Sequence, residues 1–179
     1  MKSKYELIAN THLIGIGHKC RQGKDVTAGF IIQKCEGAVK FSFANALYTV
    51  ARALFGMTEK DPLLLQALGT EVGRRNDPDR WIRTLYYQIK DASPRVAILP
   101  DVRFPNEAEF VQEMGGTLIN VQRWNEDGTR FIAEDRDPNH PSEIALEGYD
   151  GWNYIINASS GRLDTIKTSV DTILTHLGL

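Results

Sequence analysis

The sequence predicts an α/β protein whose β-sheet is mostly parallel and is covered by helices on both faces. Short apolar runs of strand length alternate along the chain with longer segments whose apolar residues recur at helical spacing. Parallel strands need crossover helices, and a sheet covered on both faces has strands that are apolar throughout. The length of 179 residues suits one domain with a substantial core. We therefore expect a single domain over residues 1–179.

The expected elements alternate in order along the chain. Strands are expected at Leu13–Gly17, Ala38–Phe43, Arg95–Leu99, Leu118–Val121 and Tyr154–Ile156. Helices are expected at Asp25–Cys35, Asn45–Phe55, Leu63–Gly73, Asp79–Ile89, Pro105–Met114 and Leu163–Leu177. Gly115–Gly116 is typical of a left-handed helix stop. The polar stretch Trp124–Pro141 has no periodicity, and such long connections are usually lids or disordered segments.

Composition narrows the class of protein. The net charge of −2 and the lack of charge blocks give no argument for a nucleic-acid partner. Cys20 and Cys35 form no disulfide or metal framework, so a reduced intracellular protein is favoured. No apolar run is long enough for a membrane helix, and the first residues lack the apolar core of a signal peptide. We expect a cytoplasmic protein without a membrane partner.

The segment LIGIGHKCRQGKDVTA, Leu13–Ala28, has the order of a phosphate-binding loop: an apolar strand, a Gly- and Lys-rich turn, then a helix. Gly23 and Lys24 fill the last two fixed positions of G-x-x-x-x-G-K before the hydroxyl residue. The first glycine should stand at His18, and Gly17 lies one residue early. The match is therefore partial.

The cations of this turn favour an anion-binding role. Lys19, Arg21 and Lys24 lie within six residues and repel one another unless an anion sits between them. Asp25 replaces the hydroxyl residue that normally meets Mg²⁺. A carboxylate is also a hard oxygen ligand, so we expect Asp25 to serve the metal directly or through water.

A second candidate site, Asp101-Val102-Arg103, follows the apolar strand Arg95–Leu99. The carboxyl edge of an open α/β sheet is where ligands bind. There Asp101 can hold a Mg²⁺ water and Arg103 can grip a phosphate. If this Asp-x-Arg motif stood alone, the better interpretation would be a loop with a helix cap and a salt bridge. A phosphate-binding loop at the same edge of the sheet weakens that interpretation.

Further arginines have two interpretations each. Arg74 and Arg75 point to different sides of a helix, so at most one faces a ligand, and a solvated helix surface explains them equally well. Arg130 and Arg136 lie in the polar stretch, and Arg123 stands immediately before it. In a lid they would neutralise transferring phosphates, whereas in a plain loop acidic neighbours would balance them.

The remaining polar and aromatic candidates are weaker. The four histidines have no metal-ligand spacing, and His18 is expected to line the loop. Trp81 and Trp152 are expected in the core or at its rim, although either could stack on a base. Ser142 is expected to cap a short helix with Glu143 in its first turn.

Several segments together resemble the phage-type deoxynucleoside monophosphate kinases. The loop GHKCRQGKD resembles the variant G-K-x-R-x-G-K-D loop of that family, which is also similar to the loop of animal phosphomevalonate kinases. Resemblance to the phage family continues in FSFANAL (Phe41–Leu47), LLQALGTEVGRRNDPDRWI (Leu64–Ile82), DVRFPNEAEFVQEMGG (Asp101–Gly116) and HPSE (His140–Glu143). The chain departs from the family at His18, where glycine is usual, and at Val26, where threonine is common.

The resemblance implies a three-layer P-loop kinase fold, with a lid at 124–141 and a helical acceptor-binding region at 44–92. It implies transfer of the γ-phosphoryl group of ATP to a deoxynucleoside monophosphate, with Mg²⁺. We assign to ATP the residues Gly17, His18, Lys19, Cys20, Arg21, Gly23, Lys24, Asp25 and Val26. We assign to the acceptor Arg74, Arg75, Asp101, Arg103 and Trp152, and to the metal Asp25 and Asp101. The residues assigned to catalysis are Lys24, Arg103, Arg123, Arg130 and Arg136.

Two other functions stay open. One is a P-loop kinase for another small phosphorylated acceptor such as mevalonate phosphate, against which the GTE and DVRFPNE segments count. The other is a nucleotide-binding module without catalysis, against which Asp101, Arg103 and the arginine-rich lid count. The apolar stripe of Leu163–Leu177 fits core packing and a homodimer seam equally well, and a phage-encoded chain would act in the host cytoplasm.

Overall fold

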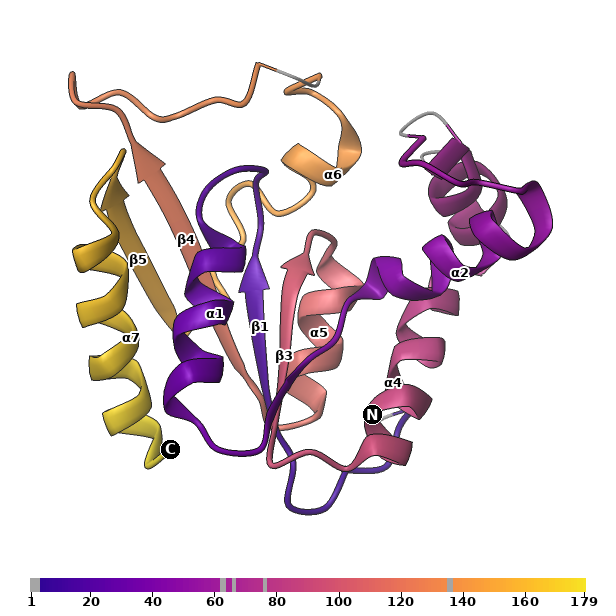
Figure 1. The fold of residues 1–179 in the computed structure, drawn as a ribbon, viewed down its shortest axis with the longest axis horizontal. Coiled ribbons are helices and arrows are strands. Elements are labelled where there is room, and N and C mark those ends of the chain that lie inside the picture. Colours follow the sequence, from indigo (N-terminus) through magenta and orange to yellow (C-terminus); the bar gives the residue numbers. More distant parts are fainter. Residues whose placement is uncertain (1–3, 62–63, 66, 76, 135–136) are drawn as a thin grey trace.

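The computed structural model describes residues 4–61, 64–65, 67–75, 77–134 and 137–179. Its centre is a five-stranded sheet in which every pairing is parallel, with the order β2-β3-β1-β4-β5 (Figure 1). The strands are β1 (His12–Gly17), β2 (Ala38–Lys40), β3 (Val96–Val102), β4 (Thr117–Trp124) and β5 (Tyr154–Ser159). The predicted α/β class with a parallel sheet is confirmed.

Helices connect the strands and cover the sheet. They are α1 (Lys24–Lys34), α2 (Phe43–Phe55), the π-helical η1 (Ala67–Arg74), α4 (Arg80–Ala92), α5 (Pro105–Glu113), α6 (Pro141–Ile144) and α7 (Leu163–Leu177). In the described part of the chain, every helix falls short of the length and apolar character needed to cross a membrane.

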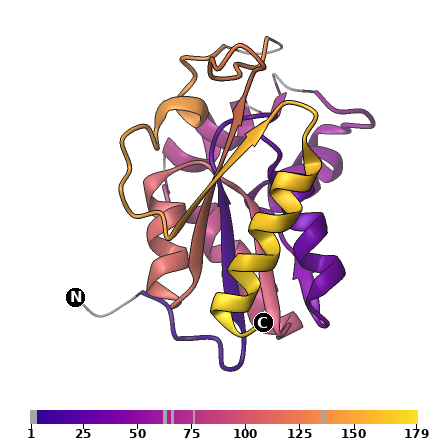
Figure 2. The same ribbon diagram turned by 90° about the vertical axis from the view of Figure 1, so that its left-hand side faces the viewer.

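Alternation along the strands divides the core into two layers. In β1, Ile14 and Ile16 face α1 and α7, whereas Leu13 faces the cluster that contains α4 and α5. Figure 2 views the sheet close to edge-on, with α5 on one side and α1 and α7 on the other. The inner strands β1 and β3 are buried almost throughout because both faces are covered, whereas the edge strands β2 and β5 are partly exposed.

The central strand β1 has no room for a side chain at Gly15 or Gly17. A Cβ on Gly15 would come within 2.9 Å of a Leu118 methyl carbon, and one on Gly17 would come within 2.3 Å of the Trp152 ring. Glycines therefore let α5 and Trp152 pack directly on β1. The carboxyl end of β1, where the loop begins, is fixed by this packing.

The end of β3 corrects one prediction. The strand was expected to stop at Leu99, but it continues through Pro100 and Asp101 to Val102. Gly15 pairs with Leu99 and Gly17 with Val102, so β3 carries one residue more than β1 between these pairs. A bulge tolerates proline because proline has no N–H to give to a ladder.

Other boundaries also differ from the sequence predictions. The strand expected at Ala38–Phe43 is wrong beyond Lys40, because Ser42 caps α2 by accepting a hydrogen bond from the Ala44 N–H. His140, not Ser142, caps α6: its ring nitrogen accepts from the Ser142 N–H at 3.2 Å. The strands β4 and β5 run up to three residues further than predicted, whereas α7 has the predicted bounds.

A small helical region stands at one side of the sheet, in the upper right of Figure 1. Its own apolar cluster contains Ala51, Met57, Leu65 and Leu68. The Trp81 indole N–H donates to the Gly69 carbonyl at 3.2 Å, which joins α4 to η1. Of the helix expected at Leu63–Gly73, Leu63 and Gln66 lie outside the described residues, and η1 covers the part from Ala67 onward and ends one residue later, at Arg74.

Candidate active site

The phosphate-binding loop joins β1 to α1 at the carboxyl edge of the sheet (Figure 1). Gly23 precedes α1 with φ 104°, a left-handed conformation that favours glycine, and a Cβ there would lie 3.1 Å from an Ile166 methyl carbon. Lys24 is the first residue of α1. The loop therefore presents the positive end of a helix together with a lysine.

Lys24 is buried, with 6% of its surface exposed. Its ammonium group donates to the Lys19 carbonyl, so the side chain folds back across the loop. Burial and the nearby Arg103 guanidinium lower the pKa of Lys24 to about 8. Among the described residues, the hydrogen-bond partner of this buried cation is a carbonyl, and such a cation is suited to receive an anion.

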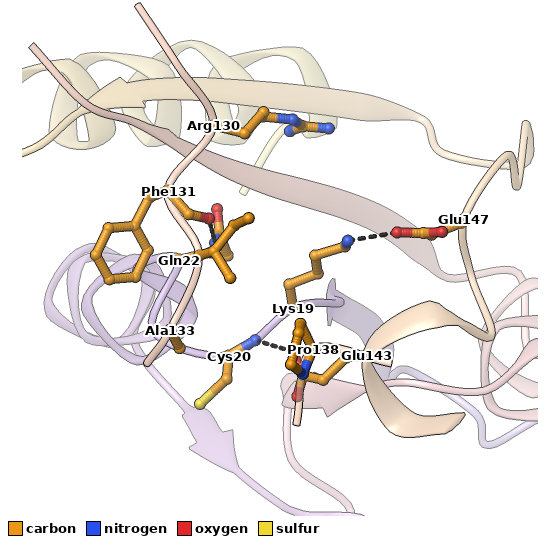
Figure 3. Close-up of a pocket in the computed structure, with 10 residues that line it drawn as sticks. Lys19, Cys20, Gln22, Arg130, Phe131, Ala133, Pro138, Glu143 and Glu147 are labelled. Atoms are coloured by element: carbon orange, nitrogen blue, oxygen red, sulfur yellow. Dashed lines mark hydrogen bonds and ion pairs between the residues drawn. The ribbon is translucent and has the colours of Figure 1, made fainter. Parts of the chain in front are cut away.

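Two carboxylates from the α6 segment reach the loop (Figure 3). Glu143 accepts a hydrogen bond from the Cys20 N–H at 2.8 Å, and Glu147 pairs with the Lys19 ammonium at 2.5 Å. Glu143 is buried, whereas the pair of Lys19 and Glu147 is exposed. The predicted repulsion among the loop cations is thus partly offset by protein anions.

Arg103 follows β3, and its side chain reaches Glu143 beside the phosphate-binding loop. Its guanidinium donates to a Glu143 carboxylate oxygen at 2.6 Å, and its backbone N–H donates to Glu107 at 2.7 Å. Burial alone would lower the pKa of Arg103, but the Glu143 carboxylate and the Cys20 side chain together outweigh burial and raise it. Arg103 is therefore a fixed cation close to Lys24.

The structure distinguishes Arg74 from Arg75. Arg74 pairs with the fully buried Glu107 at 2.5 Å, and its guanidinium lies 4.1 Å from the centre of the Phe104 ring. Arg75 is exposed. Glu107 thus connects Arg74 to the backbone of Arg103, and only Arg74 is placed beside the predicted acceptor arginine.

Asp101 caps the start of α2. Its carboxylate accepts from the Ser42 hydroxyl at 2.5 Å and from the backbone N–H groups of Phe43 and Ala44 at 3.2 and 3.1 Å. Burial raises the pKa of Asp101, and these hydrogen bonds oppose the rise. Three of its roughly four acceptor positions are therefore used.

Asp25 stands in the first turn of α1 with a side chain that is 79% exposed, and it pairs with Lys40 at 2.6 Å. Val26 beside it is also exposed. Among the residues that the structure describes, no group of three or more His, Cys, Asp or Glu side chains could hold a metal by itself. Mg²⁺ is commonly bound by one or two carboxylates together with substrate phosphates, so Asp25 still fits that mode.

A pocket of about 390 Å³ opens between the loop, the end of β5 and the start of α7. Its lining includes Lys24 and Asp25 on the loop side and three arginines, Arg21, Arg123 and Arg162. Cations from three separate segments thus surround one opening beside the start of α1.

The arginines assigned to the lid are partly described, and the assignment needs one correction: Arg123 lies in β4, just before the expected lid at 124–141. Gln22 connects the loop to this segment, because its amide donates to the Phe131 carbonyl at 3.0 Å and accepts from the Arg123 N–H at 2.5 Å. Arg123 lies 4.0 Å from the centre of the Phe131 ring, and Arg130 lies 4.9 Å from that of Trp124. Arg136 lies outside the described residues.

Arg130 also lines a second pocket, of about 240 Å³ (Figure 3). Its other lining residues include Lys19, Cys20 and Gln22 of the loop and Glu143 of α6. The segment predicted to be a lid and the loop therefore face each other across this pocket.

His18 and Trp152 form a packed pair at the base of the loop. Their rings are stacked with centres 6.1 Å apart, and within the described part of the chain both buried His18 ring nitrogens lack a hydrogen-bond partner. Burial, Lys19 and Lys24 lower the pKa of His18 to about 4. Trp152, which was expected in the core or at its rim, packs on His18 and Gly17, and its assignment to the acceptor stays a prediction.

Three polar residues of the site were not assigned a site role from the sequence. Glu143 was expected only in a helix turn, although it ends the quoted HPSE segment. Glu107 lies in the quoted DVRFPNE segment, and Gln22 lies in the loop itself. The motifs therefore contained these residues, but their partners are distant in sequence and no local pattern indicates them.

Comparison with known proteins shows that the chain is similar to kinases. No family model matches the chain. A putative deoxynucleotide monophosphate kinase from Acanthamoeba polyphaga mimivirus is 25% identical over 181 aligned residues, covering 80% of this chain and 86% of that protein. The chain is similar to a viral deoxynucleotide kinase. A deoxynucleoside-5′-monophosphate kinase from Escherichia phage T5 is 34% identical over 113 residues, covering 60% of this chain but only 42% of that protein.

Solved structures confirm the fold. Shikimate kinase from Bacteroides thetaiotaomicron aligns with a TM-score of 0.58 at 17% identity, covering 94% of this chain and 99% of that one. The tunicamycin resistance protein of Deinococcus radiodurans aligns with a TM-score of 0.53 at 14% identity, covering 94% and 96%. The chain has the three-layer α/β fold of P-loop kinases.

Proposed function

We propose that this protein transfers the γ-phosphoryl group of ATP to a deoxynucleoside monophosphate. The observation that carries the proposal is the loop GHKCRQGKD, folded at the start of α1 with Lys24 buried and Arg103 near it. The similarity to two proteins named as deoxynucleotide kinases supports this choice of acceptor. Two arginines, Arg74 and Arg103, suit a phosphorylated acceptor.

The donor nucleotide is proposed to bind in the pocket between the loop and α7. Lys24 and the loop N–H groups bind its phosphates, and Arg21, Arg123 and Arg162 line the same pocket. When Mg²⁺ is bound, it neutralises charge on the transferring phosphates. Asp25 would hold it, and Asp101 retains one acceptor position for a metal-bound water.

The acceptor phosphate is proposed to bind to Arg74 and Arg103, beside the helical region 44–92. Phosphoryl transfer needs alignment of acceptor oxygen and γ-phosphorus, charge neutralisation and exclusion of water. Lys24 and Arg103 supply fixed positive charge, and the segment 124–141 is proposed to close as a lid over the loop. Gln22 supports this closure because it already joins the two segments.

A coupled ADP-release assay over the four dNMPs and mevalonate phosphate tests the proposal. We expect ADP release to depend on at least one dNMP, and phosphorylated product to appear in equal amount. Transfer to mevalonate phosphate alone would indicate the other kinase class. ATP binding without transfer to any acceptor would indicate a silent nucleotide-binding module.

A further inference from the structure

We infer that Glu143 is a positioning residue for phosphoryl transfer, because its two carboxylate oxygens hold Arg103 and the phosphate-binding loop in one arrangement. The inference rests on the function proposed above and concerns how that site is assembled. Glu143 itself touches neither reacting group in this inference; it acts through Arg103.

One buried carboxylate joins three segments that are far apart in sequence. Oε1 of Glu143 accepts from Arg103 Nη1 at 2.6 Å, and Oε2 accepts from the Cys20 backbone N–H at 2.8 Å. Only 5% of the surface of Glu143 is exposed. Because each oxygen has a different charged or polar partner, a shift of Glu143 would move the Arg103 guanidinium relative to the loop.

Glu143 is itself held firmly by α6. His140 caps this helix, and the nearby Leu146 is 1% exposed in the core cluster that includes α4 and α5. The Ser142 carbonyl accepts from the same Arg103 nitrogen at 3.4 Å. The anchoring of α6 in the core thus fixes the carboxylate, and the carboxylate fixes Arg103.

A different role would make Glu143 a stand-in for phosphate that leaves when nucleotide binds. Its burial argues against this, because breaking a buried ion pair leaves charges without partners. Glu147 is the contrasting case: its pair with Lys19 has side chains 55% and 37% exposed, and such pairs contribute little. Both carboxylates are visible beside the loop in Figure 3.

The arrangement leaves Arg103 able to bind a phosphate. A guanidinium has five N–H donors, so the nitrogen held by Glu143 leaves others to face an anion. The carboxylate also offsets the repulsion between Arg103 and Lys24, two cations that both lie at this site. Glu143 therefore lets two positive groups stay near one transferring phosphoryl group.

The first test compares Glu143→Gln with the matched control Glu147→Gln in steady-state kinetics. Glutamine keeps the shape of the glutamate side chain but removes its charge. Its NH₂ group would face one of the two donors, the Arg103 guanidinium or the Cys20 N–H. We expect kcat to fall about 10²-fold while KM for ATP changes less than about threefold, since misplacement of a reacting group by about 1 Å has this effect. Glu147→Gln should keep kcat within about threefold.

A double-variant cycle shows whether Glu143 acts through Arg103. If it does, Glu143→Gln combined with Arg103→Gln should be no more than about threefold slower than Arg103→Gln alone. If the kcat losses of the two single variants instead multiply in the double variant, the inference is overturned. Should Glu143→Gln fail to fold, Glu143→Asp keeps the charge and shortens the reach, and the same fall in kcat with little change in KM is expected.

A readout without catalysis separates this inference from the proposed function. In the ¹⁵N-labelled protein, the Arg103 side-chain signal is assigned by its loss in Arg103→Lys. We expect this signal in the unmodified protein and in Glu147→Gln, and its loss or broadening in Glu143→Gln. An unchanged signal, or a Glu143→Gln variant with tighter ATP binding and unimpaired kcat, would overturn the positioning role. Failure of the unmodified protein to phosphorylate any dNMP would instead refute the proposed function.

Discussion

Lys24 is a buried lysine at the start of α1, with Arg103 among its neighbours and a backbone carbonyl as its hydrogen-bond partner. Such a group carries a desolvation cost that folding alone does not require. The opposite end of the same helix offers a contrast, because Lys34 forms an exposed pair with Asp171 at 3.1 Å. The two lysines therefore allow a matched comparison.

We predict that Lys24→Ala lowers kcat about 10³-fold, the scale of losing one preorganised charge at a transferring group. The free energy of unfolding should not fall, because the variant removes a buried charge. Lys34→Ala should leave kcat unchanged. The coupled ADP-release assay and urea unfolding measure the two effects, and near-normal turnover in Lys24→Ala would refute the role of this loop.

His18 departs from the glycine that is usual in the resembling family, and its buried nitrogens have no partners among the described residues. Its pKa is lowered to about 4, below the ordinary unfolded value of about 6.5. Between these values the unfolded chain binds more protons, so stability falls as pH decreases from about 6.5 to 4.

We predict that His18→Phe removes this pH dependence and keeps the stacking on Trp152. Relative to the variant, the natural protein should lose about 3 kcal/mol of unfolding free energy between pH 6.5 and pH 4, at about 1.4 kcal/mol per pKa unit. Urea unfolding of both proteins across this range measures the difference. Parallel pH profiles would show that His18 is not the group concerned.

At the scale of elements, the contact between β3 and α2 positions the helical region. Asp101 lies in β3 and accepts two N–H groups and one hydroxyl at the start of α2. The bulge around Pro100 brings this carboxylate to the helix. Asp101 thus links the start of the proposed acceptor-binding region directly to β3, beside the apolar packing of α4 on the sheet.

We predict that Asp101→Asn lowers the free energy of unfolding by about 1–3 kcal/mol, because its NH₂ group meets donors and leaves them unpaired. Ser42→Ala should cost about 1 kcal/mol as an ordinary cap loss. Urea unfolding compares the two variants. A large loss of transfer activity with unchanged stability in Asp101→Asn would instead point to contact with the metal or substrate.

At the scale of the whole molecule, nucleotide binding should stabilise the fold because the pocket between the loop and α7 involves three distant segments. The lining residues come from the loop and α1, the end of β4, and the junction of β5 with α7. None of these segments forms the site in the unfolded chain. Binding and folding are therefore coupled.

We predict that ATP with Mg²⁺ at 100 times its Kd raises the free energy of unfolding by about 2.7 kcal/mol. The effect should largely disappear in Lys24→Ala and persist in Lys34→Ala. Thermal unfolding followed by circular dichroism, with and without nucleotide, measures it. Equal stabilisation of both variants would place the nucleotide elsewhere.

The sequence alone determined the fold class and most elements, because apolar periodicity and turn residues are local signals. It also indicated the phosphate-binding loop, since Gly23, Lys24 and the preceding strand are neighbours in the chain. The bulge in β3 and the bounds of β2 escaped it, because strand pairing and caps depend on partners elsewhere.

Only the tertiary structure decided how the site is assembled. In the structure Arg74 pairs with the buried Glu107. Trp152 stacks on His18, and Asp101 caps the start of α2. The tertiary structure also brought Glu143 to Cys20 and Arg103, which lie 123 and 40 residues away in the chain. These residues can be read from the sequence, but their partners cannot. The partner of a charged group depends on distance in space, and that distance is set only when the sheet and helices pack together.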